Sequence, residues 1–103
     1  MPREAATGNV DLLLLATLEA GPAHGYGIVD AVRRRSEGAF DLAEGTVYPA
    51  LYRLERRGLV ASRWEEGARR RRMYRLTKRG ASELARERDR WQRYVRAVEA
   101  VVA

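Results

Sequence analysis

Residues 45–59 read Gly-Thr-Val-Tyr-Pro-Ala-Leu-Tyr-Arg-Leu-Glu-Arg-Arg-Gly-Leu. At about 100° per residue, Val47, Leu51 and Leu54 fall on one stripe, which predicts an amphipathic helix with one buried face. Gly58 stands where helices often end in a left-handed residue. The opposite face carries Thr46, Pro49, Arg53 and Arg56, with Tyr52 at its edge. Tyr48 is a further candidate DNA contact, and partial burial of Tyr48 and Tyr52 in the core is the alternative. Arginines, a hydroxyl and aromatic rings on an exposed face suit a DNA groove better than plain solvent.

The remaining sequence predicts two helices before this segment, and a hairpin and a long helix after it. The predicted helices cover 10–20, 25–36, 44–57 and 78–103, and the predicted strands cover 60–64 and 73–76. Thr77 is the expected cap of the last helix. Three helices followed by a two-stranded hairpin predict a winged helix-turn-helix, mostly α with a small β-hairpin. We therefore expect a flexible arm over 1–8, a DNA-binding domain over 9–77 and a dimerisation helix over 78–103.

The charge balance favours a polyanionic partner. The chain has 103 residues, a net charge of +6 and a sequence pI of about 10.5, and nineteen of its twenty cations are arginine. Arginine recognises phosphate and guanine through two parallel donors. A G+C-rich genome also favours arginine codons, so the net charge carries more weight than the arginine bias.

Four of these cations, Arg69, Arg70, Arg71 and Arg72, fall in the predicted hairpin turn. This arrangement predicts a wing that neutralises DNA phosphates or inserts a side chain into an A·T minor groove. The alternative is a solvated loop whose charges repel one another, partly offset by Glu65 and Glu66. Phosphate contact is the favoured interpretation, without base specificity for any single arginine.

The C-terminal helix carries an apolar stripe that is longer than one small domain needs. It consists of Leu84, Trp91 and Val98 at a seven-residue spacing, flanked by Val95 and Val102. This pattern predicts a homodimer interface. Trp91 has a second interpretation, because its indole face suits a flat aromatic effector bound between two subunits.

Three segments resemble the PadR family of bacterial transcriptional regulators, and in particular its short members. They are His-Gly-Tyr-Gly-Ile at 24–28, Gly-Thr-Val-Tyr-Pro followed by Arg-Leu-Glu-Arg-Arg-Gly-Leu-Val within 45–60, and Arg-Arg-Met-Tyr-Arg-Leu-Thr-Lys-Arg-Gly at 71–80. The resemblance extends from Asp11 into the C-terminal helix. One departure is Ala43, where relatives often carry a Ser or Thr helix cap.

The resemblance implies a cytoplasmic homodimer that binds an inverted repeat in double-stranded DNA and represses a nearby gene. It further implies release by a small molecule, such as a phenolic acid, a drug or another toxic compound. Some short relatives use the dimer cleft for that purpose, which supports the second interpretation of Trp91.

Other classes of function fit the sequence less well. A winged helix can also serve as a protein–protein interaction adaptor, but that function predicts an apolar or acidic face on segment 45–59. An enzyme is not expected, because the chain has no cysteine, His24 is its only histidine, and no serine lies in a triad motif. The same residues predict no metal site and no cofactor. No spanning segment is present, and mixed charges on the last helix argue against a membrane surface.

Overall fold

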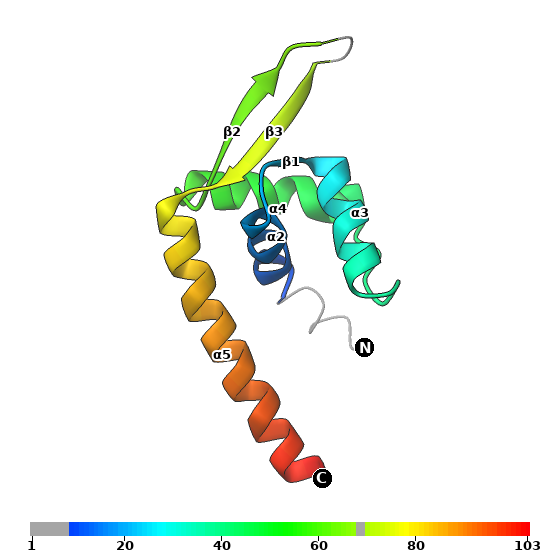
Figure 1. Cartoon of the computed structure of the whole chain (residues 1–103), viewed down its shortest axis with the longest axis vertical. Coiled ribbons are helices and arrows are strands. Elements are labelled where there is room, and N and C mark those ends of the chain that lie inside the picture. Colours follow the sequence, from blue (N-terminus) through cyan, green and yellow to red (C-terminus); the bar gives the residue numbers. More distant parts are fainter. Residues whose placement is uncertain (1–8, 68–69) are drawn as a thin grey trace.

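The computed structural model describes residues 9–67 and 70–103, so the predicted arm over 1–8 and the predicted wing residue Arg69 lie outside the described part. The elements, in chain order, are α2 (Val10–Glu19), β1 (Ala23–His24), α3 (Gly25–Arg35), α4 (Glu44–Arg56), β2 (Val60–Glu65), β3 (Arg71–Leu76) and α5 (Lys78–Val102). Figure 1 shows the hairpin projecting from one end of the molecule and α5 extending from the other. The predicted class, a winged helix with a long C-terminal helix, is confirmed.

The sheet has three antiparallel strands in the order β1-β3-β2. The hairpin joins β2 and β3, with Ser62 opposite Tyr74 and Trp64 opposite Arg72. Strand β1 was not predicted, because it has only two residues and exists through its pairing with β3, where His24 lies opposite Met73. The His24 side chain does not cap α3 but packs near the hairpin, with Nδ1 3.4 Å from the Arg72 carbonyl oxygen.

The core forms where α2, α3 and α4 meet the base of the sheet. The predicted inward stripe of α4 is confirmed, since Val47, Leu51 and Leu54 are fully buried. Helix α2 is apolar on most sides and contributes Leu14 and Leu15 to the same cluster. Burial of α4 on this one face leaves the opposite face free for function.

Both ends of α4 follow from the local sequence. Ala43 occupies the N-cap, and its methyl side chain cannot accept a hydrogen bond from the first turn of the helix. Gly58 adopts φ +76°, and its amide and that of Leu59 donate to the carbonyls of Glu55 and Leu54, both at 3.0 Å. This pair of bonds is the Schellman arrangement that satisfies the last carbonyls of a helix.

A tight junction connects the end of α4 to the start of α5. The Thr77 hydroxyl accepts a hydrogen bond from the Gly80 amide at 3.0 Å, which confirms the predicted cap, and donates to the Gly58 carbonyl at 2.7 Å. Gly80 lies so close to Leu59 that an added Cβ would stand 2.0 Å from the Leu59 carbonyl oxygen. The sequence thus fixes the angle at which α5 leaves the hairpin.

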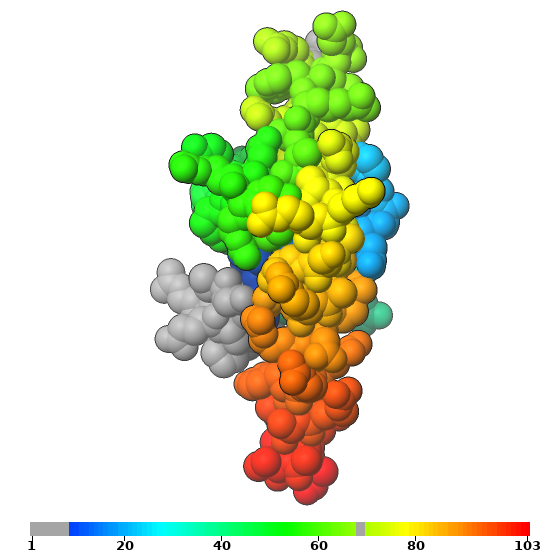
Figure 2. All heavy atoms as spheres, turned by 90° about the vertical axis from the view of Figure 1, so that its left-hand side faces the viewer, coloured from blue at the N-terminus to red at the C-terminus, as the bar shows by residue number. Residues whose placement is uncertain are grey.

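Helix α5 packs on α2 only through its first turns. Leu84 is 1% exposed and belongs to the core of this single chain, so it is not available to a partner and its assignment to a dimer interface was wrong. The first turns of α5 therefore pack with the winged helix. A two-bond contact between Arg88 and Glu19, at 2.9 and 3.3 Å, marks the last link with α2. Beyond it, α5 runs clear of the body, as Figure 2 shows from the side.

Candidate nucleic-acid interface

The outward face of α4 presents the side chains that the sequence assigned to DNA. Thr46, Pro49 and Arg56 are exposed, and so are Tyr48 (43%) and Tyr52 (60%). The Arg56 guanidinium lies over the Tyr52 ring, with its carbon 5.8 Å from the ring centre. The structure therefore groups these residues on one accessible surface, and neither tyrosine is a core residue.

Arg53 belongs to the same exposed helix but points toward α2. Its Nη2 lies 3.2 Å from Asp11 Oδ1, and Arg57 approaches the other oxygen of that carboxylate at 4.0 Å. Both arginine side chains are more than half exposed, so the pairing is weak in free energy. In the free protein the Arg53 side chain therefore lies beside Asp11, whereas Arg56 has no carboxylate partner among the described residues.

The hairpin continues this surface through one of its two faces. Side chains alternate along a strand, so the cross-strand pairs Ser62–Tyr74 and Trp64–Arg72 share a face. That face turns toward α4, because Ser62 bonds to a side chain of α4. Arg71 pairs with Glu65 in the register and lies on the other face. The predicted turn of four arginines was therefore wrong in part, since Arg71 and Arg72 belong to β3 and point to opposite sides.

A chain of hydrogen bonds connects the wing to α4. Arg72 Nε donates to Ser62 Oγ at 2.8 Å, and Ser62 Oγ donates to Glu55 Oε2 at 2.6 Å. Arg72 Nη2 also lies 3.7 Å from the same carboxylate oxygen. The Arg72 side chain is consequently held in a fixed relation to α4 and is not a freely mobile cation.

Trp64 organises the outer part of the same face. It is 51% exposed, and two guanidinium carbons, of Arg70 and Arg72, lie 4.8 and 5.3 Å from its ring. Cation–π contact of this kind orients the arginines without neutralising them. The sequence analysis did not assign Trp64 to the site. Its alternation with Ser62 on a strand facing the arginines was the signal that could have identified it.

The start of α3 completes the surface. Tyr26 is 72% exposed, and the adjacent Gly25 touches Tyr48, since an added Cβ would stand 2.7 Å from three atoms of that ring. Between α4 and the hairpin lies an open hollow of about 520 Å³. Its lining is Tyr48, Tyr52, Glu55, Arg56, Arg72 and Tyr74. Burial raises the pKa of the Tyr74 phenol at its base, so the ring stays neutral around pH 7.

The described residues include no group of His, Cys, Asp or Glu arranged to hold a metal ion. Among them, no helix has the length and apolar composition needed to cross a membrane. The surface formed by α4 and the hairpin is basic, aromatic and hydroxyl-bearing. Figure 1 shows the hairpin rising from the level of α4. These features define a winged-helix protein of the transcription-regulator class.

The chain belongs to the PadR-like family of transcriptional regulators, whose model matches residues 14–86. This membership confirms the resemblance and places the chain among regulators and not among enzymes. A transcriptional regulator from Clostridium thermocellum superposes with a TM-score of 0.91 at 28% identity, over 97% of this chain and 99% of that one. Bacillus subtilis PadR in complex with operator DNA gives a TM-score of 0.67 at 25% identity, over 73% of this chain and 44% of that one.

Two relatives are longer than this chain. The transcriptional regulator YqjI of Escherichia coli strain K12 is 30% identical over 82 residues, which are 80% of this chain and 39% of that protein. An uncharacterized 37.1 kDa protein of transposon TN4556 from Streptomyces fradiae is 40% identical over 81 residues, 79% of this chain and 22% of that protein. The chain therefore spans less than half the length of these relatives.

Proposed function

We propose that the protein is a homodimeric repressor that inserts α4 into the major groove of an inverted-repeat operator in double-stranded DNA. The observation that carries this proposal is the continuous basic and aromatic surface from Tyr48, Tyr52 and Arg56 on α4 to Arg72 and Arg70 on the wing. Arg56 would donate two hydrogen bonds to guanine, a contact worth about 1–3 kcal/mol of discrimination. Arg53 would join it after leaving Asp11. The likeness to a PadR whose structure was solved in complex with operator DNA supports DNA binding.

Thr46 and Tyr48 lie in the first turns of α4, where the positive end of the helix dipole attracts phosphate. Pro49 packs beside them on the exposed face. The wing arginines would follow the backbone, with Arg70 and Arg72 on the side facing α4 and Arg71 on the far side. The outward face of α4 is neither apolar nor acidic, so the interaction-adaptor alternative gains no support from it.

The second half of α5 supplies the proposed dimer interface. Trp91, Val95, Val98 and Val102 share one side of the helix, and Val98 is 40% exposed although it is apolar. Tyr94 and Val101, which the sequence analysis left out, are also exposed, and Tyr94 stacks on Trp91 with ring centres 5.7 Å apart. A second copy that covers this stripe would fix the spacing of two α4 helices along the DNA.

The same stripe supports a proposed effector site. The stacked pair of Trp91 and Tyr94 offers a flat apolar surface at the dimer cleft, which suits a small aromatic molecule. An effector that prefers a dimer with the wrong spacing would release the DNA by shifting the population of dimer geometries. Such a regulator would act in the cytoplasm, where the chromosome is accessible.

Footprinting of the DNA upstream of the protein's own gene tests the proposal. Protection of two symmetric half-sites is expected, and a flat aromatic drug should remove it. Binding of the drug is followed in a Trp64→Phe background, so that Trp91 alone reports by its emission. Protection without symmetry would contradict the dimer, and an absence of any protection or shift on duplex DNA would contradict the proposal as a whole.

A further inference from the structure

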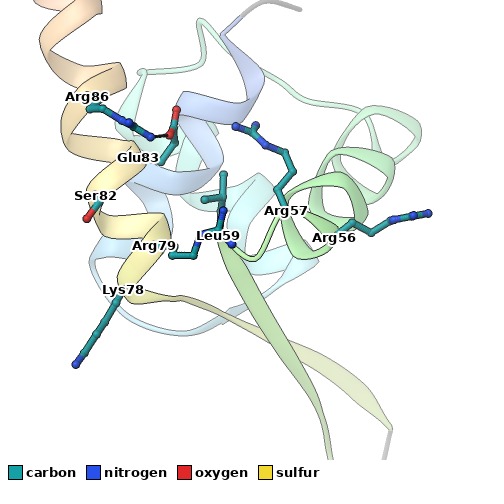
Figure 3. Close-up of a pocket in the computed structure, with 8 residues that line it drawn as sticks. All are labelled: Arg56, Arg57, Leu59, Lys78, Arg79, Ser82, Glu83 and Arg86. Atoms are coloured by element: carbon teal, nitrogen blue, oxygen red, sulfur yellow. Dashed lines mark hydrogen bonds and ion pairs between the residues drawn. The ribbon is translucent and has the colours of Figure 1, made fainter.

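A second basic surface lies beside the interface described above, where the end of α4 meets the start of α5. An open hollow of about 670 Å³ forms there, which we call the junction hollow (Figure 3). Its charged lining consists of Arg56, Arg57, Lys78, Arg79, Glu83 and Arg86. Arg57 extends from the end of α4 toward the Glu83–Arg86 pair on α5, and Arg79 lies between the two helices beside Leu59.

The charges of the junction hollow are poorly compensated. Among the described residues, Glu83 is the only carboxylate that lines it, and Arg86 already donates a hydrogen bond to that carboxylate. Arg57 comes no closer than 4.0 Å to an oxygen of Asp11. Within the described residues, no carboxylate lies in ion-pairing range of Lys78 or Arg79. The hollow therefore keeps a strong positive field in the free protein.

The start of α5 adds to this field. Carboxylates usually occupy the first turn of a helix, because the helix dipole is positive there. The first turn of α5 has no acidic residue and begins instead with Lys78 and Arg79. Placing two cations at the positive end of a helix disfavours the free protein, an arrangement expected at a functional surface. A bound anion would relieve the repulsion.

The junction hollow is continuous with the proposed DNA surface. Arg56 lines both the junction hollow and the hollow between α4 and the hairpin. Arg79 covers the bend that ends α4, since an added Cβ on Gly58 would stand 3.2 Å from Arg79 Nη1. A DNA strand that passes the outward face of α4 and leaves it beside Arg56 meets this bend next.

We propose that the junction hollow binds a phosphate of the DNA backbone adjacent to the stretch read by α4, with Arg79 and Arg57 as its donors. This inference rests on the proposed function, because it needs α4 to lie on DNA. It adds a contact that neither α4 nor the wing supplies. The contact recognises phosphate only, so it strengthens binding to every sequence alike.

The test measures how DNA affinity depends on salt. Fluorescence anisotropy with a labelled random-sequence duplex is compared for the wild type, the double variant Arg57→Ala/Arg79→Ala and the control Arg75→Ala. Arg75 is exposed, and it lines a different hollow together with Pro22 near the end of α2. Each lost phosphate contact lowers the slope of log affinity against log salt by about 0.9. Because one phosphate contact is lost, we expect the double variant to lose about 0.9 of slope and Arg79→Glu to lose at least as much, while Arg75→Ala keeps the wild-type slope.

Three outcomes would overturn the inference. One is a double variant whose slope equals that of the wild type. Another is an equal loss of slope in the Arg75→Ala control, because net charge alone would then explain the effect. The third combines two results: inorganic phosphate binds saturably, seen by NMR as shifts of the Gly58 and Gly80 amides, while the double variant keeps the wild-type salt slope for DNA. Those results would assign the hollow to a free anion. A wild type that binds no duplex at all would instead contradict the proposed function itself.

Discussion

The Ser62 hydroxyl on β2 donates a 2.6 Å hydrogen bond to the Glu55 carboxylate on α4. Ser62 also accepts a bond from Arg72 Nε at 2.8 Å, so one hydroxyl joins a carboxylate on the helix to a guanidinium on the wing. The three groups are only partly exposed, which makes these charge-assisted bonds stronger than typical surface pairs. The angle between α4 and the hairpin depends on this connection.

We expect Ser62→Ala to lower the free energy of unfolding by about 1–2 kcal/mol, because it removes both bonds and leaves Glu55 and Arg72 without their shared partner. Urea denaturation measures the change. Ser82→Ala serves as the control, since Ser82 is exposed on α5 and makes no hydrogen bond within the described residues. Equal stability of Ser62→Ala and the wild type would show that the connection contributes nothing.

Two glycine substitutions should have opposite effects on stability. A Cβ at residue 80 would stand 2.0 Å from a backbone oxygen and 2.7 Å from Leu76 Cδ1, so Gly80→Ala must separate α5 from the hairpin. We expect a loss of about 1–3 kcal/mol, typical of overpacking. Gly45 lies within α4 with no atom inside 4 Å of its added Cβ, so Gly45→Ala should stabilise by up to about 1 kcal/mol. Thermal or urea unfolding measures the stability of both variants. A Gly80→Ala protein as stable as the wild type would show that the junction between α4 and α5 is loosely packed.

The two faces of the wing predict unequal roles for neighbouring arginines. Arg70 contacts Trp64 on the face that continues from α4, whereas Arg71 belongs to the other face. Arg70→Ala should therefore weaken binding to all DNA sequences. It should also lower the slope of log affinity against log salt by the amount expected for about one phosphate contact. Arg71→Ala has the same change in charge and should have the smaller effect. Identical slopes for the two variants, in anisotropy titrations, would mean that the face of the hairpin does not matter.

The exposed stripe of α5 predicts that a charge at Val98 dissociates the dimer. Val98→Glu would bury an unpaired carboxylate against the partner, at a cost of several kcal/mol, so the dimer dissociation constant should rise at least roughly 100-fold. Ala100→Glu adds the same charge about half a turn away, on the opposite side of the helix, and should leave the dimer intact. Analytical ultracentrifugation compares the two. A dimeric Val98→Glu protein would exclude this stripe as the interface.

Local sequence patterns predicted most of the fold because each signal acts over a few residues. The period of Val47, Leu51 and Leu54, the left-handed Gly58 and the Thr77 cap all appear in the structure as expected. Strand β1 was missed because two residues carry no period, and only pairing with β3 makes them a strand.

The errors in the site arise from contacts between distant segments. Leu84 fits the seven-residue spacing of the dimer stripe, yet its burial depends on how α5 crosses α2, which spacing does not reveal. The pairing of Arg53 with Asp11 joins residues 42 positions apart. The separation of Arg70 from Arg71 depends on where β3 begins, a boundary that a run of four identical residues cannot indicate.

The central claim, that the outward face of α4 reads DNA bases, is tested most directly by the specificity of Arg56→Ala. An operator is selected by the wild-type protein from a pool of random duplexes, and affinities for it and for an unselected duplex are measured by anisotropy at fixed salt. We predict that Arg56→Ala loses about 1–3 kcal/mol on the selected duplex beyond what it loses on the unselected one. Equal losses on both duplexes would contradict base reading by this face of α4.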